Sequence, residues 1–160
     1  VKHLADFLHM LGNPVAVIDS TGSTSMTRSL NLSYPLGILD VQRTLAVCAE
    51  DGVAAVIIAM NNATLQREAL ESVNVDVLGS ERVAQGEDVA SLKTRYAFVS
   101  DRALALTVPT GESDELAAES PAMFDRDRLG HMSLAVAMVL AAGVRRNNVR
   151  SALRVANNLR

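Results

Sequence analysis

The segment from Val15 to Arg28, with the sequence VAVIDSTGSTSMTR, constrains the fold of this chain more than any other. It begins with a β-branched run, which is typical of a buried strand. A turn rich in Gly, Ser and Thr follows, and either Ser20 or Ser23 is suited to cap a helix that starts at about Thr24. The segment therefore predicts a strand, a tight turn and the N-terminus of a helix in direct succession.

That order of elements is the one by which a phosphate-binding loop aims free backbone N–H groups at an anion. The usual form of the loop ends in Gly-Lys followed by Ser or Thr. Here Gly22 is followed by Ser23 and Thr24, so a hydroxyl group stands where a cationic side chain is expected. We predict that a nucleotide would contact the backbone of Gly22, Ser23, Thr24 and Ser25, and only weakly, because Asp19 adds a negative charge beside them.

The composition is that of one ordinary globular domain. The 160 residues are 49% hydrophobic and 21% charged, and a domain of this size buries about 70% of the surface of its unfolded chain. The net charge of −3 gives no global basic field, which argues against nucleic acid or an anionic membrane as a partner. No apolar run approaches the ~20 residues of a membrane-spanning helix. The single cysteine, Cys48, excludes an intrachain disulfide and favours a reducing, cytoplasmic location.

Alternating strand and helix patterns predict an α/β fold: a mostly parallel sheet flanked by helices, in a P-loop NTPase-like three-layer architecture. The continuous apolar run Val53–Met60 is typical of a central parallel strand. Further strands are expected at Val15–Ile18, Val73–Leu78, Tyr96–Ser100 and Ala103–Val108. Helices are expected at Lys2–Leu11, Thr24–Leu32, Val41–Glu50, Thr64–Ser72, Leu129–Ala142 and Asn148–Leu159, and a surface loop at Thr110–Pro121. Because the sequence contains no internal repeat and no linker-like segment, residues 1–160 are expected to form a single domain.

Taken in order, these motifs resemble the central domain of the Mur ligase family, which includes peptidoglycan-precursor ligases, folylpolyglutamate synthase, cyanophycin synthetase and poly-γ-glutamate synthetases. The family loop reads approximately VTGTNGKTSxTR, and Val17–Arg28 aligns with it without a gap. The two agree at Gly22, Thr24, Ser25, Thr27 and Arg28. Near the end of the chain, Ser133–Val144 and Val149–Leu153 resemble two successive helices of the family.

The same resemblance identifies catalytic groups that this chain lacks. Asp19 and Ser23 replace the first glycine and the lysine of the family loop. After the long apolar strand, Ala59 and Ala63 stand where the family has a magnesium-binding glutamate and a histidine. The segment Gly79–Ala84 replaces a family segment with the pattern TNxxxDHxD.

A working member of the family uses ATP and Mg²⁺ to form an acyl phosphate, which an amine then attacks to give an amide bond. The resemblance therefore implies a degenerate Mur-ligase-like domain that has lost this activity and has a structural or interaction role in a larger synthetase or complex. On that view the chain is a fragment or shortened version of a longer one. The alternative is a diverged ATP-dependent carboxylate–amine ligase acting in cell-wall or poly-amino-acid synthesis. We expect no catalytic residue, no metal site and no cofactor, with ATP and Mg²⁺ relevant only to residual activity.

A stripe of arginines is the candidate partner-binding surface. Arg146, Arg150 and Arg154 share one face of the helix expected at the end of the chain. Such a stripe is either a solvated face or a contact for a protein partner or sister subunit. Acidic residues that follow the long strand lack the family's spacing for magnesium ligands and are expected to be surface charges: Asp76, Glu81, Glu87 and Asp88.

Overall fold

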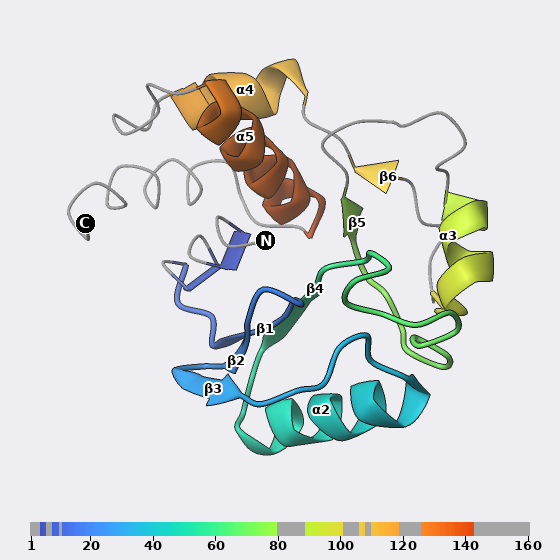
Figure 1. Ribbon diagram of the computed structural model, residues 1–160. Coiled ribbons are helices and arrows are strands. Elements are labelled where there is room, and N and C mark those ends of the chain that lie inside the picture. The colour runs from blue at the N-terminus through green and yellow to red at the C-terminus, as the bar shows by residue number, and fades with distance from the viewer. Residues whose placement is uncertain are drawn as a thin grey trace.

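The computed structural model describes residues 4–5, 8–9, 11–79, 89–100, 106–107, 110–118 and 126–142. The strands are β1 (Val15–Ile18), β2 (Ser23–Ser25), β3 (Arg28–Leu30), β4 (Ala55–Ile58), β5 (Leu78–Gly79) and β6 (Leu106–Thr107). The helices are α2 (Ile38–Glu50), α3 (Val89–Tyr96), α4 (Gly111–Ala118) and α5 (Arg126–Ala141), as Figure 1 shows. No helix within the described ranges is long and apolar enough to cross a membrane.

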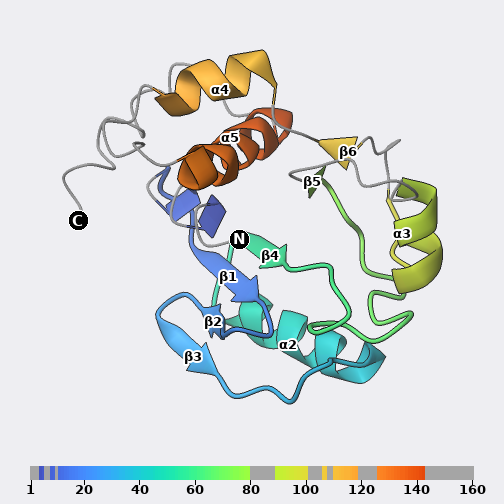
Figure 2. The same cartoon turned by 45° about the horizontal axis from the view of Figure 1, so that its top comes forward.

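The larger sheet is mixed. Its strand order is β3-β2-β1-β4, and β1 runs parallel to β4, with Val15 opposite Ala55 and Ile18 opposite Ile58. The pairs β1–β2 and β2–β3 are both antiparallel. The short strands β5 and β6 form a separate parallel pair. Figure 2 shows β2 and β3 as a hairpin that folds back beside β1. The predicted mostly parallel, P-loop NTPase-like three-layer sheet is therefore wrong.

The difference originates in the turn after β1. Gly22 adopts a φ of +153°, a backbone conformation that residues with a side chain rarely adopt. The chain reverses there, so Ser23–Ser25 returns along β1 instead of starting the helix predicted at Thr24–Leu32. Ser and Thr have modest helix propensity, and Thr fits readily into a strand, so pairing with β1 prevails over the weak helical pattern.

Elements with strong local patterns are confirmed. The strand at Val15–Ile18 has the predicted bounds, and β4 lies within the predicted run Val53–Met60. The helices α2 and α5 match the predictions to within three residues at either end. In α2, the backbone N–H of Gly37 donates to Asp40 Oδ2 at 3.1 Å, which fixes the start of the helix.

Other predicted elements are wrong or lie outside the described residues. Turns replace the helix predicted at Thr64–Ser72, and Tyr96 ends α3 instead of starting a strand. The acidic segment predicted as a loop contains α4. The helix predicted at Asn148–Leu159 lies outside the described residues.

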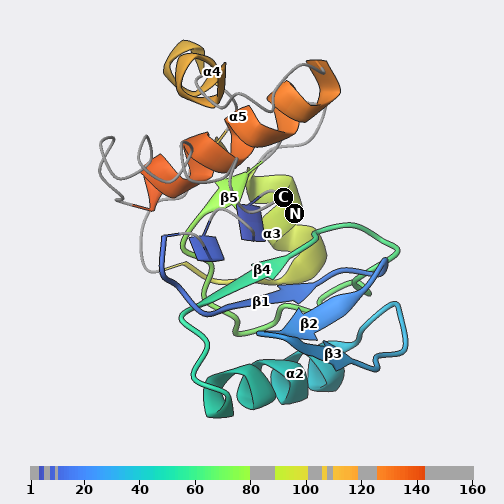
Figure 3. The same cartoon turned by 90° about the vertical axis from the view of Figure 1, so that its left-hand side faces the viewer.

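Two hydrophobic clusters lie on opposite faces of the larger sheet. Alternate residues of a strand point to opposite faces, so Ile57 joins one cluster and Ile58 packs against the other. The first cluster joins β1 and β4 to α4 and α5, and Figure 3 shows α5 on that side of the sheet and α2 on the other. The second cluster joins α2, the turns after β4 and the end of α3. Its fully buried members include Ile18, Leu36, Val41, Leu65, Leu70, Tyr96 and Phe98.

Strand β4 forms one edge of the larger sheet. On its inner side, the N–H of Ala55 donates to the Pro14 carbonyl and the N–H of Ala59 donates to the Ile18 carbonyl. Because backbone groups in a parallel ladder alternate in direction, the N–H groups of Val56 and Ile58 point away from β1. No strand among the described residues pairs with that outer side of β4.

Candidate functional site

The carboxyl ends of the parallel strands β1 and β4 carry two polar turns, one at 19–22 and the other at 61–64. In open sheets with parallel strands, ligands bind at this edge, because the loops that follow the strands meet there. The first turn contains most of the sequence that predicted a nucleotide site. We therefore take these two turns as the candidate site.

The backbone amides of the first turn are all occupied. The N–H of Gly22 donates to the Asp19 carbonyl at 3.0 Å, and the N–H of Thr21 donates to Asp19 Oδ1 at 3.1 Å. The N–H of Asp19 donates to Ser23 Oγ at 3.1 Å, and the N–H of Ser20 donates to Thr64 Oγ1 at 3.1 Å. A phosphate cradle requires N–H groups that are free to point at an anion. This turn uses its amide donors to hold its own shape.

Ser23 occupies the position at which a phosphate-binding loop has its lysine. Its side chain is 3% exposed, and its hydroxyl group donates to the Asp19 carbonyl at 3.1 Å. The same hydroxyl group is hydrogen-bonded to the hydroxyl of Tyr34. Ser23 is therefore a buried link between the turn and the segment that leads into α2.

The second turn joins β4 to the first turn and to α3. Thr64 is fully buried; its N–H donates to Asn61 Oδ1 at 2.9 Å, while its hydroxyl oxygen accepts the bond from Ser20. The Tyr96 hydroxyl donates to Asn62 Oδ1 at 3.3 Å. Of the two alanines at family positions for a glutamate and a histidine, Ala59 is buried and Ala63 is exposed. Neither contributes a polar side chain to the site.

Ser25, the last of the predicted nucleotide-binding residues, belongs to a second network. Its hydroxyl donates to Asp51 Oδ2 at 2.6 Å, and Arg28 donates to the same oxygen at 2.7 Å. Burial raises the pKa of the nearby Cys48 thiol. The Ser25 hydrogen bond and the guanidinium of Arg28 lower the pKa of Asp51. Because the pKa of Asp51 is lowered on folding, its contribution to stability is present above the ordinary carboxyl pKa and is lost on acidification through the lowered value. This network ties the β2–β3 hairpin to the end of α2.

In the structure, the four predicted nucleotide-binding residues therefore have different roles. Gly22 and Ser23 shape the turn, Thr24 lies in β2 opposite Val17, and Ser25 bonds to the end of α2. Their nucleotide-binding role stays a prediction, without the helix N-terminus on which it was based. Arg146, Arg150 and Arg154 lie outside the described residues, as do Glu81, Glu87 and Asp88. Within the described ranges, no group of three His, Cys, Asp or Glu side chains is arranged to hold a metal ion.

Sequence reasoning missed Tyr34, Asp51 and Thr64 as partners of this site. They lie 11, 26 and 44 residues from the groups they bond, so no local motif links them. The pattern Asp51-Gly52 indicated only the end of a helix. Comparisons with protein-family models, with curated proteins and with solved structures find no match for this chain.

Proposed function

We propose that this chain is a degenerate Mur-ligase-like domain with a structural or interaction role in a larger cytoplasmic synthetase or complex, and without ATP-dependent ligase chemistry. The observation that carries the proposal is the closed turn after β1. Its amide donors are bonded within the protein, and its serine is buried where the family loop has a lysine.

Electrostatics support the same conclusion. Asp19 stands in the turn, and a unit charge 4 Å from a phosphate repels it by about 1 kcal/mol in water and by more when water is excluded. No lysine follows Gly22 to offset that repulsion. The reducing cytoplasm is consistent with the single, buried and unpaired cysteine, Cys48.

Titration of the purified chain with MgATP tests the loss of ligase chemistry. We expect no saturable binding heat in calorimetry and no phosphate release above background, because the turn offers no free backbone N–H group to the phosphates. Gly22→Asp serves as the control, since it adds a second negative charge to the turn. Magnesium-dependent turnover in the parent that Gly22→Asp abolishes would overturn the proposal and favour the alternative, a diverged carboxylate–amine ligase.

Charge reversal of the arginine stripe tests the interaction role. We expect the triple variant Arg146→Glu, Arg150→Glu, Arg154→Glu to shift the molar mass measured by light scattering from an assembly towards the monomer. Surface substitutions usually change stability by under ~0.5 kcal/mol each, so its melting temperature should stay within a few degrees of the parent's. A variant that associates like the parent would show that the stripe is a solvated face with no part in assembly.

A further inference from the structure

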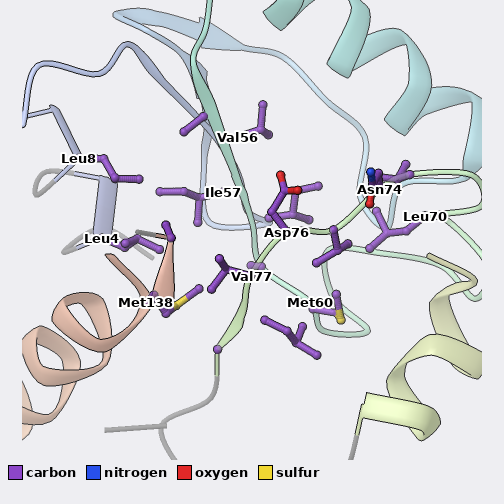
Figure 4. A pocket seen from close by; sticks show the side chains of 18 of the residues that line it. Leu4, Leu8, Val56, Ile57, Met60, Leu70, Asn74, Asp76, Val77 and Met138 are labelled. Atoms are coloured by element: carbon purple, nitrogen blue, oxygen red, sulfur yellow. The ribbon is translucent and has the colours of Figure 1, made fainter. Parts of the chain in front are cut away.

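A large cavity lies between the outer side of β4 and the segment 70–79. Its volume is about 1120 Å³, and α5, the helical residues near the N-terminus and part of α2 complete its walls. Figure 4 shows Val56 and Ile57 of β4 on one side of it, with Val77 and Met138 close by. Well-packed protein interiors have few voids larger than a water molecule, whereas ligand pockets have volumes of ≈ 300–1,000 Å³. The volume of this cavity lies just above that range, so a small-molecule ligand would fit in it.

The walls of this cavity are mainly apolar. The lining includes Leu4 and Leu8, the strand β4, Val75 and Val77, and the α5 residues Met138 and Val139. At Gly79 an added Cβ would lie 2.3 Å from Met138 Sδ, so the absence of a side chain there lets α5 close onto the wall. An apolar ligand gains free energy from leaving water for such a surface, while water filling it would find few partners.

Within the described part of the lining, the charged groups have one sign. Among the described residues that line the cavity, Glu71 and Asp76 are charged, and none is Lys, Arg or His. Figure 4 shows the Asp76 side chain among the lining residues beside β4. Asp76 is exposed, and within the described ranges no side chain forms a hydrogen bond or an ion pair with its carboxylate. The cavity thus combines an apolar wall with a carboxylate that has no side-chain partner in the part of the chain that the structure describes.

We propose that this cavity binds an amphipathic amine, with the alkyl or aromatic body against β4 and α5 and the ammonium group at the Asp76 carboxylate. Charge complementarity selects this occupant: a fatty acid of the same shape would place its carboxylate beside Asp76 and Glu71, where like charges repel. A neutral alcohol would contact the apolar wall but would leave the Asp76 carboxylate unpaired. The proposal goes beyond the interaction role suggested above and does not depend on it.

Calorimetric titration of the full chain with n-octylammonium, 1-octanol and n-octanoate tests the ligand class. We expect saturable binding of the amine and at least about tenfold weaker binding of octanoate, which corresponds to ~1.4 kcal/mol. Asp76→Asn should weaken amine binding about threefold or more, as for a partly exposed ion pair, and leave octanol binding unchanged. Glu50→Gln, which removes an exposed acid from α2 outside the cavity, should change neither affinity. No saturable binding of the amine, or equal losses for amine and alcohol in Asp76→Asn, would overturn the proposal.

A fluorescence experiment locates the bound ligand. The chain contains no Trp, so Val56→Trp introduces one reporter at the cavity wall, and Leu39→Trp introduces one on the exposed surface of α2. We expect n-octylammonium to shift the emission of Trp introduced at position 56 and to leave that at position 39 unchanged. Binding heat in both variants without any shift at position 56, or equal shifts at both positions, would place the ligand elsewhere and overturn the assignment.

Discussion

Replacing Ser23 by lysine is expected to destabilise the fold by about 3 kcal/mol or more rather than to restore a phosphate-binding loop. The side chain of Ser23 is 3% exposed and is hydrogen-bonded to Asp19 and Tyr34. Lysine would lose these bonds, leave Tyr34 without its partner and bring an ammonium group into a space that fits a hydroxyl. Urea unfolding followed by circular dichroism measures the change.

Thr21→Lys is the matched control, because it places the same charge at an exposed position of the same turn. We expect it to change the free energy of unfolding by under ~0.5 kcal/mol. If Ser23→Lys were as stable as this control and bound MgATP, the turn would be a true phosphate-binding loop. The sequence resemblance would then describe this region better than the hairpin does.

Phe98→Ala is expected to cost about 3–5 kcal/mol of stability, which is typical of removing a buried aromatic ring. Phe98 is 1% exposed and packs in the cluster that contains Leu70 and Tyr96. This cluster holds the segment after α3 against the turns that follow β4. The loss of the Phe98 ring should lower the midpoint of urea unfolding. The circular dichroism spectrum of the folded variant should match that of the parent.

Val99→Ala provides the control for that experiment. Val99 is the next residue, its side chain is 45% exposed, and its role is carried by its backbone. Its N–H donates to the Val73 carbonyl at 2.9 Å, and its carbonyl accepts from the N–H of Val75 at 2.8 Å. Alanine keeps both bonds, so we expect a change of under ~0.5 kcal/mol. Equal losses from the two substitutions would show that the ring of Phe98 is not part of the core.

The sequence predicted elements whose pattern is local. The β-branched run at Val15–Ile18 and the apolar stretch that contains β4 are strands, and the periodic stretches that became α2 and α5 are helices. A helix or strand that is buried on one or both faces needs apolar residues at those positions, so its pattern can be read from the segment alone. The sequence around α4 also carries a local helix signal, although the segment is acidic and turn-rich. Thr110 and Ser113 cap the helix reciprocally, with each backbone N–H bonded to the other hydroxyl group.

The site and the sheet direction could not be predicted, because both depend on distant partners. Whether Ser23–Ser25 starts a helix or a strand depends on β1 as a pairing edge and on Asp51 as the partner of Ser25. The loop motif specifies residue types but not the hydrogen bonds that these residues form. The same hydroxyl-rich sequence is therefore compatible with an open phosphate cradle or, as here, with a turn that bonds to itself.

The outer edge of β4 gives the chain a route to aggregation. The residues from Val53 to Met60 carry no charge, and the outward N–H groups of Val56 and Ile58 are available to another strand. Natural sheets protect such edges with lysine, proline or a bulge, whereas here the segment 70–79 faces the edge across the cavity. Partial unfolding that lifts this segment would uncover an uncharged, β-branched strand able to template pairing between copies. We therefore expect the chain segment that lines the cavity to limit the pairing of β4 with a strand of another copy.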